Sequence, residues 1–170
     1  MIYIKLQREI YGLKYHYLKE KMSKFERFEK EKRAILEGFK KGVIILTRKK
    51  LMKRVNWCGI EDKAGVYIIY GVIHGKRQLL YIGKAGEILN SGDVKYRLKK
   101  RISSAPRKGC SLGKQYYNKL VKRFNKIEIE WYVTFDEDKK YNVIPVKVEA
   151  DLIQAYYDIF NCLPPENKEF

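Results

Sequence analysis

The sequence has few cysteines, few histidines and no long apolar run. Its 170 residues include three cysteines and two histidines. Cys58, Cys110 and Cys162 lie far apart without a Cys-x-x-Cys pair, so neither a disulfide framework nor a zinc site is indicated. No apolar run is long enough to cross a bilayer, and charged residues occupy the place of a signal peptide's apolar region. We therefore expect a soluble, unexported protein in a reducing, cytoplasmic compartment.

Acidic residues are also scarce relative to basic ones. The chain has 37 Lys and Arg against 20 Asp and Glu, which gives a formal net charge of +17. Such an excess attracts polyanions, and nucleic acid is the leading partner, although a lysine-rich solvated surface has the same composition. A membrane surface is a weaker candidate, because no helix near the ends of the chain sets a bulky apolar face opposite a lysine face.

The basic excess is concentrated in the first third of the chain, where residues 1–55 carry 17 Lys or Arg and 6 Asp or Glu. Helical spacing of apolar residues and a capping box at residues 23–26 predict two helices before Gly38. We therefore divide the chain into a basic helical arm, residues 1–58, and a domain over residues 59–170. One run in the arm is dense enough to neutralise several phosphates, although such runs are often only solvated. It contains Arg48, Lys49, Lys50, Lys53 and Arg54.

Residues 65–70 and 79–84 are apolar and rich in β-branched and aromatic residues, which predicts two strands of a β-hairpin. A turn centred on His74 places Tyr67 opposite Tyr81, with both phenols on one face of the sheet. The same face is expected to carry Ile69 and Leu79.

The remaining segments alternate between helical and strand patterns. Apolar residues at 94, 98 and 102 predict a helix opened by a cap at residues 91–93, and residues 116–124 predict a second helix. Residues 127–135 alternate as a strand, and Pro145 opens a last helix whose buried side includes Glu149. A carboxylate aimed at a core requires a cation, a metal or several donors. The fold class predicted is α+β, with a three-stranded antiparallel sheet flanked by helices and a basic helical N-terminal extension.

Several of these side chains suit chemistry on phosphodiesters. Glu149 offers the hard oxygen that Mg²⁺ prefers, and Arg97 or Arg101 can bind phosphate oxygens in a bidentate manner. Tyr67, partly deprotonated by nearby cations, could take a proton from water, although the usual pKa of a tyrosine is about 10. The two histidines, His16 and His74, are too few for a histidine-metal nuclease.

The order Gly65-Val66-Tyr67 and then Tyr81-Ile82-Gly83 resembles the GIY-YIG nuclease family, named for these two tripeptides, with Val in place of Ile. The resemblance covers residues 64–168. It implies a GIY-YIG type fold and a divalent-metal-dependent endonuclease, with Mg²⁺ or Mn²⁺ as cofactor and double-stranded DNA as substrate. A restriction-type enzyme is one of the biological roles it allows, beside homing, repair and phage-encoded degradation.

The resemblance also assigns roles to residues of this chain. Tyr67 becomes the general base or a group that positions the nucleophile, and Tyr81 hydrogen-bonds at the reaction centre. Lys84 lowers the pKa of the tyrosine, Glu149 binds the metal, and Asn167 orients the site. The basic run of the arm, together with Lys100 and Arg101, is assigned to DNA binding.

The family's helix motif can be aligned with this sequence in two ways, and each alignment selects a different arginine to stabilise the phosphate. Residues 93–98 look like the family's helix start, which selects Arg97, whereas residues 98–102 select Arg101. We favour Arg97, because the predicted cap fixes its place. Many family members carry His or Tyr one helical turn beyond the arginine, but here that position is Arg101 or Ala105.

Two other functions remain open on the sequence alone. The first is a non-catalytic nucleic-acid-binding module on the same scaffold, and the second is a structural basic protein associated with RNA. Within the nuclease hypothesis one site cuts one strand, so double-strand cleavage requires a homodimer or successive nicks. The arm is then an extra DNA contact or a dimer interface.

Overall fold

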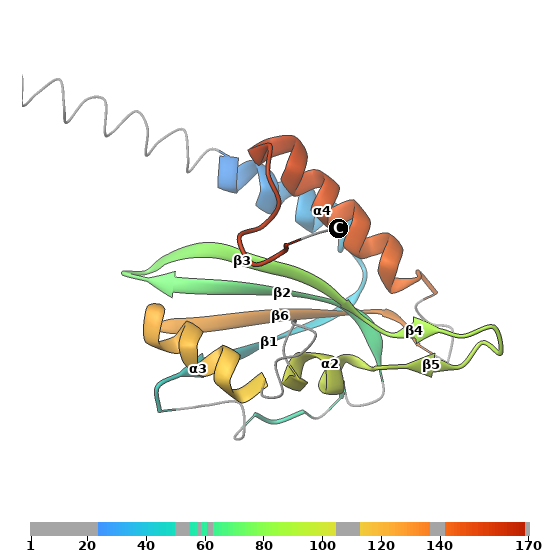
Figure 1. Cartoon of the computed structure of the whole chain (residues 1–170). Coiled ribbons are helices and arrows are strands. Elements are labelled where there is room, and N and C mark those ends of the chain that lie inside the picture. The colour runs from blue at the N-terminus through green and yellow to red at the C-terminus, as the bar shows by residue number, and fades with distance from the viewer. Residues whose placement is uncertain are drawn as a thin grey trace, which may run out of the picture.

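A four-stranded antiparallel sheet lies at the centre of the fold, with strand order β1-β6-β2-β3 (Figure 1). The computed structural model describes residues 24–49, 55–57, 59–60, 63–104, 113–136 and 142–168. Residues 24–35 are helical. The strands of the main sheet are β1 (Lys40–Thr47), β2 (Ala64–Ile73), β3 (Lys76–Ala85) and β6 (Lys126–Phe135), and a small ribbon is formed by β4 (Glu87–Ile88) and β5 (Val94–Lys95). The remaining helices are α2 (Leu98–Ser104), α3 (Gly113–Arg123) and α4 (Pro145–Phe160).

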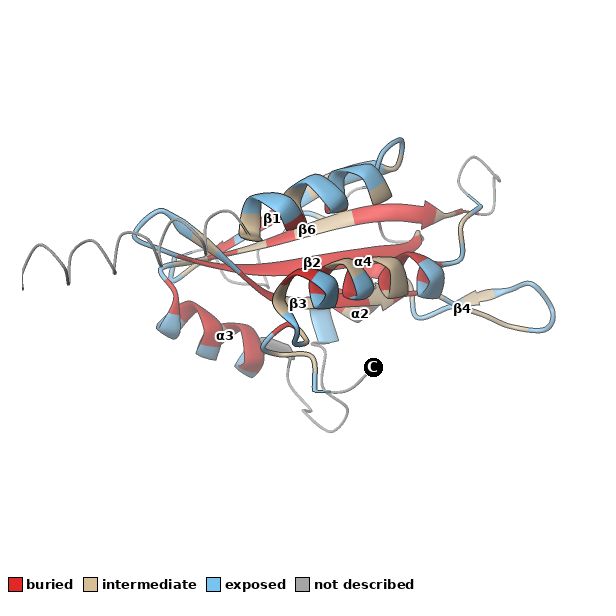
Figure 2. Ribbon diagram, turned by 90° about the horizontal axis from the view of Figure 1, so that it is seen from above, coloured by how far each residue is buried: buried red, intermediate tan, exposed pale blue. Residues whose placement is uncertain are grey.

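Helices cover both faces of this sheet, so the side chains of β2 alternate between two apolar cores. Tyr67 and Ile69 face α2 and α3, whereas Val66 and Tyr70 face α4 and the helical residues 24–35. β2 is consequently buried along nearly its whole length (Figure 2). A strand buried on both faces is apolar throughout, which is why residues 65–70 show no polar alternation. No helix among the described residues is both long and apolar enough to cross a membrane.

The α+β class is confirmed, but the predicted three-stranded sheet is wrong. Residues 40–47, expected within the helical arm, form β1 and pair with β6 from Lys40↔Val133 to Thr47↔Lys126. The helical residues 24–35 were predicted correctly, and their Phe28 lies in the same core as α4. The sheet therefore continues across the predicted boundary between residues 58 and 59. The first predicted helix lies outside the described residues.

The predicted register of the β2–β3 hairpin is wrong, because the turn contains two residues and β3 contains a bulge, so Tyr67 does not lie opposite Tyr81. His74 and Gly75 both have positive φ, 49° and 74°, as a two-residue type I′ turn requires. Tyr81 pairs with Ile69, but the next pair is Tyr70↔Leu79, so one residue of β3 is extra. Because the two-residue turn pairs Leu79 with Tyr70, Leu79 lies in the core under α4 and not beside the two phenols. A shift of one residue moves a side chain to the opposite face.

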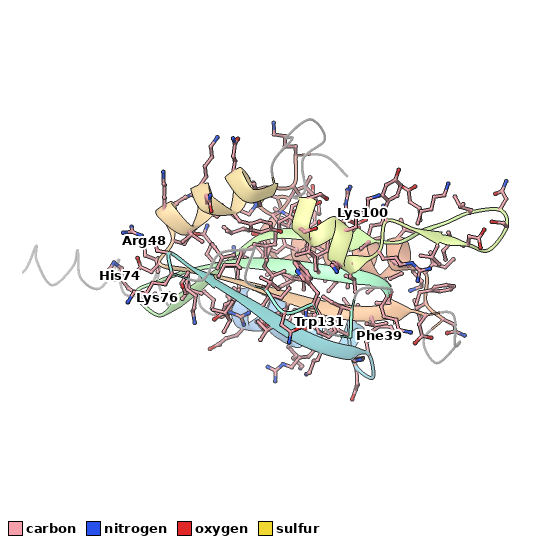
Figure 3. The ribbon with its side chains drawn as sticks, turned by 90° about the horizontal axis from the view of Figure 1, so that it is seen from below. Phe39, Arg48, His74, Lys76, Lys100 and Trp131 are labelled. Atoms are coloured by element: carbon pink, nitrogen blue, oxygen red, sulfur yellow. The ribbon has the colours of Figure 1, made fainter. Side chains whose placement is uncertain are left out.

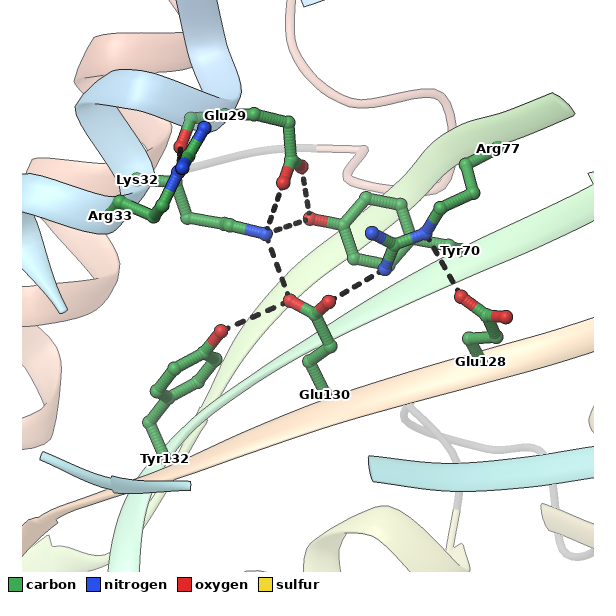
Figure 4. A network of polar contacts seen from close by, with 8 residues as sticks. All are labelled: Glu29, Lys32, Arg33, Tyr70, Arg77, Glu128, Glu130 and Tyr132. Atoms are coloured by element: carbon green, nitrogen blue, oxygen red, sulfur yellow. Dashed lines mark hydrogen bonds and ion pairs between the residues drawn. The ribbon is translucent and has the colours of Figure 1, made fainter. Parts of the chain in front are cut away.

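An ionic network attaches the helical residues before β1 to the sheet (Figure 4). Lys32 is only 3% exposed, and its Nζ lies 2.7 Å from Glu29, 2.9 Å from Glu130 and 3.0 Å from the Tyr70 hydroxyl. Arg77 donates to the other oxygen of Glu130 at 2.6 Å. Burial by itself would raise the pKa of Glu130, but Lys32 and Arg77 outweigh it and lower that pKa. The segment is thus fixed by buried charges as well as by apolar contacts.

Candidate active site

Tyr67 of β2 and Tyr81 of β3 lie side by side on the sheet face that α2 and α3 cover. Their ring centroids are 5.8 Å apart. They are diagonal neighbours, because Tyr67 pairs directly with Gly83. A Cβ on Gly83 would lie 2.4 Å from Cε1 of Tyr81, so the Tyr81 ring occupies the space above this glycine. The glycine of the second tripeptide thereby allows one phenol to reach the other.

Burial keeps both phenols protonated. Burial raises the pKa of Tyr67 well above 10, and its neighbours Tyr81 and Tyr117 raise it further, against a lowering effect of Arg101. The pKa of Tyr81 is also raised, by burial first and by Glu149 second. The geometry between the two hydroxyls falls short of a hydrogen bond, and the Tyr67 hydroxyl has no such partner among the described residues. The expectation that nearby cations deprotonate Tyr67 is therefore wrong in this structure.

Arg101 is the arginine whose charge acts on both phenols, since it lowers the pKa of Tyr67 and of Tyr81. The cap predicted at residues 91–93 does not open a helix, because residues 94–95 form β5 and α2 begins only at Leu98. Ser91 instead donates to Asp93 at 2.7 Å within the β4–β5 turn. Arg97 precedes α2, so the reason for preferring it over Arg101 no longer holds.

Glu149 lies on the buried side of α4, as predicted, and is 8% exposed. The ammonium of Lys84 lies 3.1 Å from its carboxylate and supplies the cation that a buried acid requires. Lys84 pairs with Val66, whose side chain faces α4, so it reaches the acid and not the rings of the phenols. Glu149 nevertheless acts on Tyr81, because it raises the pKa of that phenol.

The donor set for a metal is a single carboxylate. Among the described residues, no group of three or more His, Cys, Asp or Glu side chains could hold an ion. Mg²⁺ is commonly bound through only one or two carboxylates together with substrate phosphates and waters, so Glu149 alone fits that pattern. A bound divalent cation would share this carboxylate with Lys84.

No family model matches the chain, and no curated protein or solved structure matches it either. The resemblance carried by the two tripeptides therefore stays a prediction.

Asn167 holds the outer edge of β3. Its side-chain amide donates to the Ile82 carbonyl at 2.8 Å and accepts from the Ile82 amide at 3.0 Å. The amide of Glu166 donates to the Leu80 carbonyl at 2.9 Å. These bonds fix the backbone on either side of Tyr81, so Asn167 is a positioning residue for β3.

Those residues assigned to DNA binding that the structure describes lie at two places. Arg48 and Lys49 are exposed and follow β1, at the end of the sheet where the β2–β3 turn lies (Figure 3). Lys100 is exposed on α2, near Arg101. The rest of the predicted run lies outside the described residues: Lys50, Lys53 and Arg54.

Tyr117 of α3 is a member of the site that the sequence did not reveal. It is buried, and its hydroxyl has no hydrogen-bond partner among the described residues. It raises the pKa of Tyr67, and burial followed by nearby phenols, including Tyr81, raises its own pKa. Helical periodicity predicted that residue 117 faces inward, but it cannot show that Tyr117 affects the pKa of Tyr67.

Proposed function

We propose that the protein is a divalent-metal-dependent endonuclease of GIY-YIG type that hydrolyses DNA phosphodiester bonds. The observation that carries the proposal is the position of Tyr81. Its ring lies beside Tyr67, and its pKa responds both to Arg101 of α2 and to Glu149 of α4. The charges of a guanidinium from α2 and of a carboxylate from α4 thus both act on the phenol of Tyr81, which lies beside Tyr67. The net charge of +17 supports a polyanionic substrate.

Each of these groups has a role in hydrolysis. Arg101 stabilises the charge that develops on the phosphate, and the protonated phenols of Tyr67 and Tyr81 donate hydrogen bonds at the reacting centre. Glu149 would hold Mg²⁺ or Mn²⁺, and Lys84 positions that carboxylate. When bound, the divalent ion supplies charge stabilisation and lowers the pKa of a bound water. Asn167 keeps β3 in place.

The proposal predicts that the protein nicks supercoiled plasmid in Mg²⁺ and not in a chelator. Glu149→Gln keeps the shape of the side chain but removes its charge. It should raise the Mg²⁺ concentration for half-maximal nicking at least about tenfold, because a hard divalent cation prefers a carboxylate. Asp158→Asn, the same change at an exposed position of α4, is the control and should behave like the wild type. Equal Mg²⁺ requirements in all three proteins would refute the role of Glu149.

The pKa directions predict how nicking depends on pH. Because burial raises the pKa of Tyr67 and of Tyr81, both remain protonated from pH 7 to 9 and their donor role does not change over that range. Substituting Phe for Tyr67 should therefore lower the nicking rate by a similar factor at pH 7, 8 and 9. A rate that rises about tenfold per pH unit in the wild type, and loses that rise in the variant, would instead make Tyr67 a general base.

A specific observation favours the alternative of a non-catalytic nucleic-acid-binding module. The Tyr67 hydroxyl is fully buried, and Lys84 already neutralises Glu149. Binding of duplex DNA with no nicking in Mg²⁺ or Mn²⁺ would select this alternative. Within the nuclease proposal, the share of linear product among the cleaved plasmid separates a homodimer from successive nicks.

A further inference from the structure

The β4–β5 ribbon is anchored where β3 ends and where α2 begins. Gly86 follows the last residue of β3, and its amide donates to the Tyr96 carbonyl at 2.9 Å. The amide of Leu98 donates to the Lys63 carbonyl at 2.9 Å and fixes the start of α2. Figure 1 shows the ribbon extending beyond the end of the main sheet. Tyr96 therefore sits at the base of a projecting ribbon, shortly before Arg101.

Tyr96 is an exposed aromatic residue on an unfavourable backbone. Its φ is +55°, a left-handed conformation that Gly or Asn adopts at lower cost than Tyr. Burial does not offset this cost, because the side chain is 47% exposed. The Nζ of Lys100 lies 4.9 Å from the ring centroid, a cation–π contact that keeps the ring beside α2. The structure thus holds an aromatic face and an ammonium together in solvent.

The surroundings of this pair are basic. Lys95 and Lys99 are exposed on either side of Tyr96 in sequence, and Arg97 is half-buried between them. An exposed aromatic ring amid cations is the arrangement with which proteins bind single-stranded nucleic acid, because any unpaired base can stack on the ring while cations bind the backbone. A fully paired duplex offers no free base face for such stacking.

We infer that Tyr96 and Lys100 form a binding site for an unpaired nucleobase and its phosphate, next to the proposed cleavage site. Tyr96 stacks on the base, and Lys100 binds the phosphate. This inference rests on the proposed function and narrows its substrate to DNA with unpaired bases near the cut, such as a flap, a loop or a frayed end.

The test measures the affinity of the full chain, without metal, for a duplex carrying a single-stranded flap and for the same duplex without it. The wild type should bind the flap substrate more tightly. Tyr96→Asn should weaken that binding by about five- to hundredfold, the effect of losing one stacked base, and should change duplex binding little. Asn accepts the left-handed backbone, so the substitution does not disturb the fold.

Two further variants serve as controls. Tyr96→Phe keeps the ring and should retain flap binding, whereas Tyr157→Ala removes an equally exposed tyrosine, 49% exposed on α4, and should have no effect. Lys100→Gln should weaken binding of both substrates and reduce its salt dependence by about one phosphate contact.

The outcomes separate this inference from the proposed function. Equal affinity of the wild type for both substrates, or unchanged flap binding by Tyr96→Asn, would overturn the inference even if plasmid nicking is observed. A change of oligomeric state in Tyr96→Asn without a loss of flap binding would assign the ring to a contact between copies and overturn it as well. Preferred flap binding without any nicking would support the inference and refute the nuclease.

Discussion

Arg101→Gln should lower the nicking rate by about 10²- to 10³-fold, the usual effect of removing one group that stabilises the charge of a transition state. The reason is its position, since the Arg101 guanidinium acts on both Tyr67 and Tyr81. The rate is measured in single turnover at saturating protein, so that the loss reports chemistry and not affinity for DNA.

Arg97→Gln is the matched control. It makes the same chemical change four residues earlier, before α2 begins. We expect only a few-fold effect, through weaker attraction of DNA. A larger loss for Arg97 than for Arg101 would restore the register that the sequence favoured. Unfolding curves of both variants should overlay that of the wild type, because neither side chain belongs to the buried cores.

Lys32→Met should lower the free energy of unfolding by about 3–5 kcal/mol, as expected when one partner of a buried ion pair is removed. The ammonium pairs with Glu29 and Glu130, and both carboxylates are largely shielded from water. Met is similar in length and apolar, so the loss reports the charge and not a cavity. Urea unfolding at neutral pH measures the effect.

Lys30→Met is the control for this substitution, because Lys30 is exposed on the same helical segment. Its effect should remain within about 0.5 kcal/mol. Adding Glu130→Gln to Lys32→Met should recover part of the loss, since a neutral amide needs no counter-charge. A loss below about 1 kcal/mol in Lys32→Met would mean that apolar contacts alone hold the helix on the sheet.

The sign of the pH dependence follows from Glu130. Burial opposes ionisation, but Lys32 and Arg77 outweigh it and lower the pKa of Glu130 below its usual 4.5. The stabilisation is therefore complete above that usual value, and it is lost as the pH falls from there through the lowered one.

Apolar runs and alternation predicted the strands β2, β3 and β6, and helical periodicity predicted α3 and α4. These patterns are clear because each strand is largely buried and each helix buries one apolar face. Tyr67 and Tyr81 do share one face, as predicted, but through a different register, because the two-residue turn and the bulge each shift β3 by one residue. The extra residue in β3 could not be predicted, since a bulge between Ile69 and Tyr70 has no marker in an apolar run. β1 was missed because only residues 43–46 are apolar, between lysine-rich flanks.

The start of α2 illustrates a different failure. Ser, Gly and Asp at residues 91–93 serve helix caps and hairpin turns equally well, and the structure uses them for a turn. The sequence also could not predict that the phenol pKa values are raised, because this shift depends on how deeply other elements bury Tyr67. Helical spacing placed Glu149 on a buried face of α4. The sequence could not predict its ion pair with Lys84, because Lys84 lies on β3, far from α4 in sequence.

The bond between Asn167 and Ile82 joins residues 85 positions apart. A polypeptide is synthesised in one direction, so the hairpin that carries both phenols leaves the ribosome long before α4 and the segment that closes the edge of β3. A nascent chain arrested after Tyr81 and before Glu149 would therefore contain the phenols without the carboxylate. We expect such incomplete products to be inert toward the nucleic acid around them, which delays any proposed hydrolysis until α4 and the segment that reaches Asn167 have been synthesised.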